Sequence, residues 1–176
     1  MNVQEATTRR LPDLKGRYLP ENCRETINTI LKETYGYEQF RNLEIYDDLS
    51  KGKEKLCISQ GQLIENVILE AEKAWKGETQ VDNILLTAPT GSGKSLLFQL
   101  PAIYLGKEYN LLTIVVSPLK ALIVDQVESL QELGYMRVAY ASSDLSPEQK
   151  MEVYRQVREG EIDLFYLSPE LLLSYD

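Results

Sequence analysis

Residues 84–95 read Ile-Leu-Leu-Thr-Ala-Pro-Thr-Gly-Ser-Gly-Lys-Ser, and this stretch constrains the fold more than any other part of the chain. Its first half is apolar or β-branched, as expected for a buried strand, and its second half is a glycine-rich loop that leads into an apolar helical run. Glycines allow φ above zero, so that successive backbone N–H groups can point toward one anion. The order of strand, glycine loop and Lys-Ser at a helix start predicts the phosphate-binding loop of a nucleotide-binding α/β protein.

The residues of this loop carry separate parts of the expected chemistry. The backbone that we expect to surround the phosphates comprises Thr90, Gly91, Ser92 and Gly93. Lys94 supplies a positive charge for the β- and γ-phosphates and is the candidate catalytic residue, while the Ser95 hydroxyl is a hard oxygen ligand suited to Mg²⁺. Ala88 stands where the usual motif opens with glycine. The alternative interpretation is a plain turn between two core elements.

Composition limits what else the chain can be. Its 176 residues are 43% hydrophobic and suffice for one domain with a hydrophobic core, and no apolar run has membrane-spanning length. No secretory leader opens the sequence, so we expect a cytoplasmic protein. Two cysteines and no histidine give neither a disulfide framework nor a zinc site, and they exclude histidine acid–base catalysis within these residues. The net charge of −8 argues against a broad basic face, but it leaves room for a local groove in which backbone N–H groups meet phosphates.

The part before residue 59 is predicted to be irregular and helical. Residues 1–20 show no clear periodicity, and residues 21–35 have the apolar spacing of a helix that ends near Gly36. Apolar residues at 40, 43, 46 and 49 predict a second helix, followed by a surface loop at 50–53. Ser59 and Gln62 then form a capping-box pattern that opens a helix with an apolar stripe to Trp75.

Beyond the phosphate loop, strands and helices alternate. The predicted strands are 112–117, 136–141 and 162–167, and the predicted helices are 95–105 (with Pro101 inside it or ending it early), 119–133, 147–159 and a last one that starts at 168–170. Ser146 and Gln149 give a second capping-box pattern, and Gly160 ends that helix. Near-continuous apolar strands separated by helices predict an α/β fold with a three-layer parallel sheet. The expected domains are 1–58, an irregular and helical segment, and 59–176.

Three connections that leave strand ends carry a family resemblance. They are residues 88–95, residues 117–122 (Ser-Pro-Leu-Lys-Ala-Leu) and residues 166–171 (Tyr-Leu-Ser-Pro-Glu-Leu). In this order and spacing they resemble motifs I, Ia and Ib of the superfamily 2 DEAD/DEAH-type helicases. The form of 117–126 and of 166–170, with Tyr-Gly-Tyr-Glu-Gln-Phe-Arg at 35–41, looks most like the RecQ-type ATP-dependent DNA helicases. The resemblance implies a P-loop, RecA-like topology for residues 59–176 and ATP with Mg²⁺ as cofactors.

The resemblance also assigns a strand-binding role to the two Ser-Pro turns. In the family, motifs Ia and Ib hold the backbone of a single strand, and the positions that match are Ser117, Pro118, Leu119, Lys120, Ser168 and Pro169. RecQ-type proteins more often carry an apolar residue at the position of Lys120. In the alternative interpretation the role is structural, and both prolines only start helices at the ends of strands. The implied partner is single-stranded or partly duplex nucleic acid, with DNA favoured over RNA.

A third implied site is an adenine pocket built on motif 0. Its aromatic and its arginine, which sandwich the base, match Tyr37 and Arg41, and its glutamine should read the base edge. Glu44 occupies the usual spacing after Arg41, whereas Gln62 has the better local context and implies a long insertion between Arg41 and Gly61. Gln62 could instead only complete the Ser59 cap, and Tyr37 and Arg41 could be ordinary packing and surface residues.

ATP hydrolysis needs an acidic residue at a strand end, and this chain shows no convincing one. Asp125 follows an apolar run, but its neighbours have helical spacing, and Asp176 ends the chain. In the family, the Asp-Glu box and the second RecA-like lobe come later than these residues. We therefore expect an N-terminal fragment of the first lobe that binds ATP but has little ATPase activity alone, and whose partner is the second lobe of the full-length chain.

Other functions remain open at the level of sequence. A DEAD/DEAH-type RNA helicase shares the three motifs in looser form. A P-loop kinase or nucleotide switch would use the loop but bind no polymer, and a scaffold that had kept the fold would need no nucleotide. The Ser-Pro turns separate the helicases from the kinase, and the dependence of nucleotide binding on Lys94 separates all of these from the scaffold.

Overall fold

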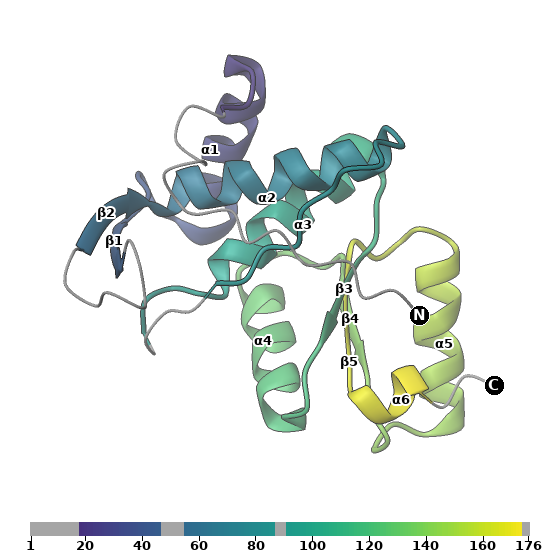
Figure 1. Ribbon diagram of the computed structural model, residues 1–176. Coiled ribbons are helices and arrows are strands. Elements are labelled where there is room, and N and C mark those ends of the chain that lie inside the picture. Colours follow the sequence, from purple (N-terminus) through teal and green to yellow (C-terminus); the bar gives the residue numbers. More distant parts are fainter. Residues whose placement is uncertain (1–17, 47–54, 87–90, 174–176) are drawn as a thin grey trace. The chain divides into compact units, whose positions relative to one another are not determined.

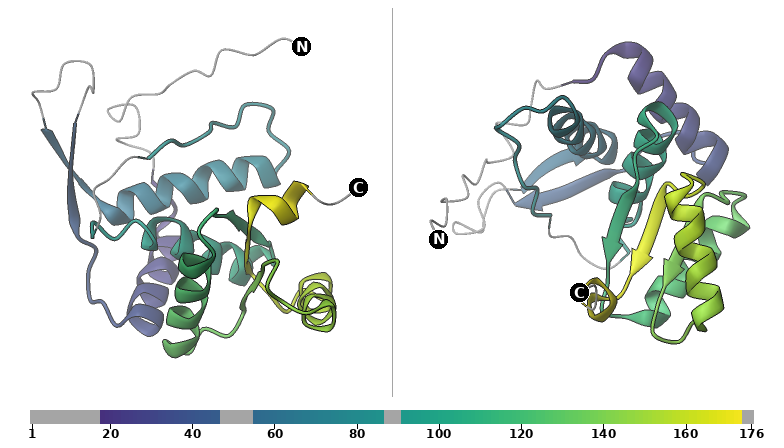
Figure 2. Two further views of the ribbon diagram at one scale, coloured as in Figure 1. Left: turned by 90° about the horizontal axis from the view of Figure 1, so that it is seen from below. Right: turned by 90° about the vertical axis from the view of Figure 1, so that its right-hand side faces the viewer.

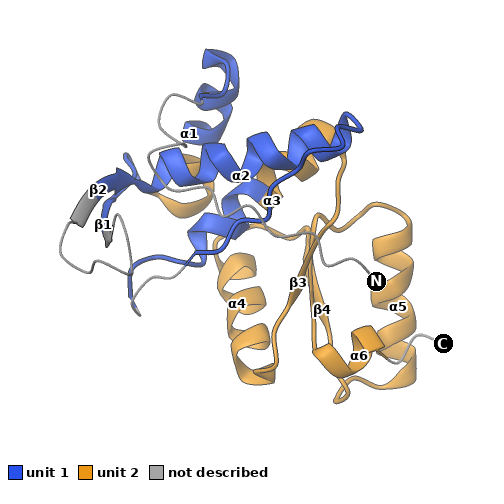
Figure 3. Ribbon diagram, viewed as in Figure 1, with its two compact units in different colours: residues 1–29, 37–101 blue, residues 30–36, 102–176 orange. Residues whose placement is uncertain are grey.

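The computed structural model describes residues 18–46, 55–86 and 91–173, whose helices and strands are drawn in Figure 1. The chain divides into two compact units, coloured separately in Figure 3. Unit 1 comprises Met1–Thr29 and Tyr37–Pro101, and unit 2 comprises Ile30–Gly36 and Ala102–Asp176. The division falls inside α1 (Glu21–Tyr35) and α3 (Leu96–Tyr109), so each unit contains a part of both helices. No helix within these described ranges is long and apolar enough to cross a membrane.

Unit 1 contains a two-stranded antiparallel hairpin followed directly by a helix. The strands are β1 (Asn42–Tyr46) and β2 (Lys55–Ser59), and the helix is α2 (Gln60–Trp75). Leu43 lies opposite Ile58 in the hairpin, and both side chains are buried, so an apolar pair holds the base of the hairpin together. Ser59 is the N-cap of α2, as predicted, although its hydroxyl accepts a hydrogen bond from Gly61 N at 3.2 Å rather than from Gln62 N.

The hairpin overturns the helix predicted over residues 40–49. The apolar residues at 40, 43 and 46 recur at helical spacing, but residues 42–46 form β1. The spacing misled because a hairpin is decided by the partner strand, which supplies hydrogen bonds and a cross-strand apolar contact that no local period reveals. Residues 47–49 and the loop predicted at 50–53 lie outside the described residues.

The strand predicted immediately before the phosphate loop is not found at residues 84–86, the part of it that the structure describes. Residues 81–86 have no regular secondary structure, and Leu85 is 92% exposed. A strand is held by hydrogen bonds to a neighbouring strand, and an apolar sequence does not provide that neighbour. The remaining predicted strand residues, 87 and 88, lie outside the described part of the chain.

Unit 2 is built on a three-stranded parallel sheet, which confirms the predicted α/β fold class. Its strands are β3 (Thr113–Val116), β4 (Val138–Ala141) and β5 (Leu164–Leu167), in the order β3-β5-β4. Helices α4 (Lys120–Glu132) and α5 (Pro147–Arg158) lie on opposite faces of this sheet, giving three layers (Figure 1). All three strands end at the same edge, as their arrowheads in the right-hand view of Figure 2 show. The short helix α6 (Pro169–Leu173) follows β5 at this edge.

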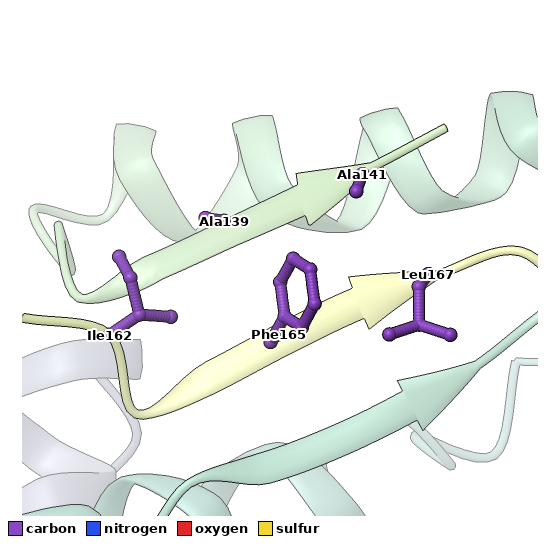
Figure 4. Close-up of a cluster of buried hydrophobic side chains, with 5 residues drawn as sticks. All are labelled: Ala139, Ala141, Ile162, Phe165 and Leu167. Carbon is purple, nitrogen blue, oxygen red and sulfur yellow. The ribbon is translucent and has the colours of Figure 1, made fainter. Parts of the chain in front are cut away.

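The face of the sheet toward α5 carries one cluster of buried apolar side chains (Figure 4). Phe165 and Leu167 of β5 contribute the largest groups, and the side chains packed against the cluster include Tyr154 of α5, whose ring meets that of Phe165 edge to face at 6.3 Å. At the other end of the sheet order, β3 pairs only with β5 among the described strands, and Ile114 and Val116 remain about half exposed, at 51% and 44%.

Three helix signals predicted from the sequence are found in the structure, although α3 runs to Tyr109, four residues beyond its predicted end. Ser146 and Gln149 form the reciprocal capping box, with bonds of 3.2 Å from Gln149 N to Ser146 Oγ and 2.9 Å from Ser146 N to Gln149 Oε1. Pro101 lies inside α3, one of the two outcomes predicted. Asp125 lies on α4, as predicted, and not at the end of a strand.

The amino ends of β4 and β5 meet a buried hydrogen-bond network around Asp163. This residue is 3% exposed, and its carboxylate accepts bonds of 2.7 Å from the Tyr135 hydroxyl and from two nitrogens of Arg137. Burial, together with the bond to Asp163, raises the pKa of Tyr135, so its hydroxyl remains a donor. Arg137 also donates to Gly160 O at 2.7 Å. Gly106 of α3 approaches so closely that a side chain there would overlap the Asp163 carboxylate.

Candidate functional site

The phosphate loop is described from Gly91 onward, and Thr90 lies outside the described residues. Gly91 and Gly93 have φ values of +80° and +79°, the left-handed region that residues with a side chain rarely adopt. Lys94 is exposed, Ser95 is half-buried, and α3 begins at the next residue. The first N–H groups of an α-helix have no intrahelical acceptor, so the loop ends where an anion is favoured. These residues therefore fit a nucleotide phosphate.

A buried glutamine fastens this loop to the start of the hairpin. Gln60, 2% exposed, donates from Nε2 to Ser92 O at 3.2 Å, and its Oε1 accepts from Arg41 N at 3.1 Å. Its backbone N donates to Arg41 O at 2.9 Å. Gly93 lies against the same amide, because a Cβ at this position would come within 2.6 Å of Gln60 Nε2. Residues 41, 60 and 92–93 thus form one connected group within unit 1.

The structure brings the predicted adenine-sandwich pair together. The guanidinium carbon of Arg41 lies 5.9 Å from the centre of the Tyr37 ring, within cation–π range. Tyr37 is 48% exposed, so its ring presents a face that a ligand can reach. A flat base between an aromatic ring and a guanidinium needs about 7 Å, twice the van der Waals contact distance. At 5.9 Å the two groups are therefore closer together than they would be with a base between them.

The hairpin explains how Arg41 and Gln60 can be far apart in the sequence and still be neighbours in the structure. β1 begins one residue after Arg41 and β2 ends one residue before Gln60, with Asn42 opposite Ser59. Gln62 lies in the first turn of α2, half-buried, two residues after Gln60. Glu44, the other candidate for reading the adenine edge, lies on β1 and is exposed.

In unit 2, the two Ser-Pro turns lie at adjacent strand ends. Ser117 N donates to Leu167 O at 3.1 Å, which continues the pairing of β3 with β5 by one residue. The Ser117 hydroxyl accepts from Leu119 N at 3.3 Å, and Pro118 and Leu119 are exposed. Because parallel strands end at one edge, the structure brings both turns to the same edge of the sheet, as predicted for a shared site.

Lys120 reaches across this edge to the loop that follows β4. Its ammonium donates to the Ser143 hydroxyl and pairs with Asp144 Oδ1 at 2.9 Å. The hydrogen bond from Lys120 lowers the pKa of the Asp144 carboxyl, which therefore stays ionised at neutral pH and loses the pair only as the pH falls through that lowered pKa. Both side chains are well exposed, so a polyanion could compete with Asp144 for the ammonium.

The second turn is less accessible than the first. Ser168 is 1% exposed, and its carbonyl accepts from Leu171 N at 3.1 Å and Leu172 N at 3.2 Å as α6 begins. Pro169 is half-buried. The Ser168 hydroxyl is itself buried, whereas Glu170 after the turn is exposed.

Three side chains of these sites escaped sequence reasoning: Gln60, Ser143 and Asp144. For Gln60, the available signal was the Gln-Gly-Gln run at 60–62, in which Gln62 matches the capping-box position and Gln60 matches no motif. For the other two, the Ser-Ser-Asp run after a predicted strand indicated a polar strand end. Their partners come from residues 19 to 32 positions away, which sequence pattern alone cannot pair.

A phosphate-binding loop at a helix start, in a chain whose parallel sheet lies between helices, defines the class of P-loop α/β proteins. Within that class the chain belongs to the DEAD/DEAH box helicase family, whose family model matches residues 60–175. The matched range begins at the first residue of α2 and includes the phosphate loop and both Ser-Pro turns.

The similar proteins named below are all ATP-dependent DNA helicases by name. The chain is 34% identical over 151 residues to the ATP-dependent DNA helicase RecQ of Synechocystis, which covers 86% of the chain and 25% of that protein. It is 32% identical over 148 residues to the ATP-dependent DNA helicase RecQ of Bacillus subtilis, covering 84% of the chain and 20% of the relative. The ATP-dependent DNA helicase Q-like 5 of Arabidopsis thaliana is 32% identical over 86% of the chain, which covers 13% of that protein. The chain thus spans a quarter or less of the length of these relatives.

Proposed function

We propose that this chain is the ATP-binding part of an ATP-dependent nucleic-acid helicase or translocase, with DNA favoured over RNA as the polymer. The observation that carries the proposal is the loop geometry at Gly91 and Gly93, immediately before Lys94, Ser95 and helix α3, in a chain of the helicase family. The preference for DNA is supported by the relatives named above, which are DNA helicases by name.

In this proposal the loop grips the triphosphate. Backbone N–H groups of residues 90–93 and the N-terminus of α3 face the phosphates, and the Lys94 ammonium neutralises the β- and γ-phosphates. Ser95 is the chain's own ligand for Mg²⁺, which when bound would neutralise phosphate charge. Tyr37 and Arg41 sandwich adenine, and the contact between the two side chains supports this assignment. Gln62 is preferred over Glu44 for reading the base edge, because a carboxylate cannot donate to an adenine ring nitrogen.

The carboxyl edge of the sheet in unit 2 is the proposed strand-binding surface. Ser117, Pro118, Leu119 and Lys120 from the first turn and Ser168 and Pro169 from the second are the residues assigned to it. Backbone N–H groups and one lysine suit a sequence-independent grip on phosphates, which is compatible with a chain of net charge −8. A bound phosphate would take the place of Asp144 beside the Lys120 ammonium, at little cost because the pair is exposed.

Hydrolysis and movement are assigned to the full-length protein. We propose that residues 1–58 form an N-terminal segment and 59–176 a part of the first RecA-like lobe, and that the Asp-Glu box and the second lobe are supplied outside these residues. The start of the family match at residue 60 and the short coverage of the relatives support this division. The isolated chain is then expected to bind ATP with little turnover, and DNA-stimulated turnover by it would contradict this part.

The central test is the loss of nucleotide binding on removal of the loop's charge. Titration calorimetry of the chain with MgATP should give saturable binding, and Lys94→Ala should weaken it by at least about tenfold, because a charge-assisted contact contributes about 1.5–3 kcal/mol. Lys107→Ala, an exposed lysine at the far end of α3, is the matched control and should bind as wild type does. Undiminished binding by Lys94→Ala would exclude a functional phosphate loop.

A second experiment separates polymer-dependent functions. Fluorescence anisotropy of labelled single-stranded DNA and of RNA with the same base sequence should show binding, with DNA favoured. Stronger binding of RNA would favour the DEAD/DEAH-type RNA helicase, the runner-up within the family. No binding of either polymer would favour a kinase or nucleotide switch.

A further inference from the structure

Gln60 is a buried polar residue that connects two segments of the proposed nucleotide site, the one at Arg41 and the phosphate loop at Ser92. At 2% exposure, its amide bonds at both ends, to Arg41 N at 3.1 Å and to Ser92 O at 3.2 Å. These partners lie 19 residues before it and 32 residues after it. A buried amide costs free energy unless its hydrogen bonds are made, so an apolar side chain could fill the same space without this requirement.

The fit around this amide is close on the side of the phosphate loop. Gly93 has φ +79°, and a Cβ there would lie 2.6 Å from Gln60 Nε2, so the Gln60 amide would have to shift to accept a side chain. Gly91 has nearly the same φ, +80°, but a Cβ there would meet nothing within 4 Å. The two loop glycines therefore share a backbone requirement, and only Gly93 also has to accommodate Gln60.

We propose that Gln60 is a positioning residue that fixes the distance between the Tyr37–Arg41 pair and the phosphate loop. The inference rests on the proposed nucleotide site and adds to it a mechanical link: base contacts and phosphate contacts are held in register by one side chain. A ligand that makes both sets of contacts benefits from this preorganisation, whereas a ligand that reaches only the phosphates gains little from it. Gln60 touches no nucleotide itself in this arrangement.

The test compares two probes on the same protein. Titration calorimetry with MgATP and with magnesium tripolyphosphate gives two dissociation constants. Their ratio, the constant for tripolyphosphate divided by that for MgATP, reports how much the nucleoside part of ATP adds to binding. Gln60→Ala is expected to weaken MgATP about fivefold to tenfold and tripolyphosphate about twofold or less, because about one net hydrogen bond of coupling is lost. Gln60→Glu keeps the acceptor for Arg41 N but places a carboxylate against Ser92 O, and should lower the ratio as well.

The control is another buried amide of the same helix. Asn66 is 3% exposed, and its Nδ2 donates to Gln62 O at 2.7 Å within α2, away from Arg41 and Ser92. Asn66→Ala should lower the temperature of unfolding and leave the ratio of the two dissociation constants at its wild-type value. Gly93→Ala keeps Gln60 but crowds its amide, and should also lower the ratio.

Each outcome decides between the two proposals. If the wild-type chain fails to bind MgATP, or binds it regardless of Lys94, both proposals fall. If binding depends on Lys94 but both Gln60 variants keep the wild-type ratio, the nucleotide site stands and the link does not. A loss of binding sites per chain with an unchanged ratio would show that Gln60 only supports folding.

Discussion

The two ends of the parallel sheet in unit 2 use similar charged pairs to different effect. At the amino end, Asp163 is 3% exposed and accepts bonds of 2.7 Å from Tyr135 and Arg137. At the carboxyl end, Lys120 and Asp144 pair at 2.9 Å with side chains 42% and 68% exposed. In the first pair the carboxylate is buried although the Arg137 side chain is 44% exposed, whereas in the second pair both side chains are open to competition.

This difference separates what holds the sheet from what the sheet can bind. A buried carboxylate that loses its partners is costly, because water cannot replace them, whereas an exposed ion pair contributes little and exchanges readily. Parallel sheets bind ligands at their carboxyl ends. The amino end can therefore be fixed by a network that never has to open, while the charges at the carboxyl end stay available.

The largest effect is expected from breaking the network at the amino end. Asp163→Asn removes the charge opposite Arg137 and should destabilise the chain by about 2–4 kcal/mol. Urea unfolding followed by circular dichroism measures it. Asp144→Asn is the matched change at the other end and should leave the unfolding midpoint unchanged, because that side chain is 68% exposed. Equal losses would erase the proposed distinction between the ends.

A change of intermediate size tests the close approach of α3 to the same carboxylate. Gly106→Ala should stabilise a helix by about 1 kcal/mol if only helix propensity mattered. Because the added methyl group would overlap Asp163, we instead expect destabilisation by about 1–3 kcal/mol, as for other overpacked cores. The two expectations differ in sign, so thermal unfolding of this one variant decides between them.

The smallest effects belong to the carboxyl end and concern binding rather than folding. Lys120→Ala should weaken binding of single-stranded DNA about twofold to fivefold and reduce the salt dependence by about one phosphate contact. Asp144→Asn should strengthen binding slightly, because the ammonium no longer has to leave a carboxylate. Anisotropy titrations at several salt concentrations measure both. Opposite signs for the two variants are the expected result, and equal weakening would assign the pair a structural role.

Sequence reasoning succeeded where structure is decided by near neighbours. The capping box at Ser146 and Gln149, the helical position of Asp125 and the α/β alternation of unit 2 follow from residues within a few positions of each other. It failed at β1 and at residues 81–86, where the outcome depends on whether a partner strand is present.

In the candidate sites, too, residues whose role depends on partners distant in the sequence could not be predicted. Side chains on recognisable motifs, such as Lys94 and Lys120, could be named from the sequence. Gln60 could not, because its importance lies in contacts with Arg41 and Ser92 that only the folded chain creates. The ion pair of Lys120 with Asp144 was equally invisible, since the two residues meet only when β4 and β3 share one sheet.

The hairpin between Arg41 and Gln60 makes the length of that insertion almost irrelevant to the site. The first residue of β1, Asn42, pairs with the last residue of β2, Ser59. The Cα atoms of such a pair lie about 5 Å apart, whatever the length of the chain between them. Removing register-matched pairs from the outer end, such as Tyr46 with Lys55, would shorten the arm and keep its foot in place. Such an arm can vary in length and sequence from one protein to another, as exposed β-hairpins commonly do, while Arg41 and Gln60 stay neighbours.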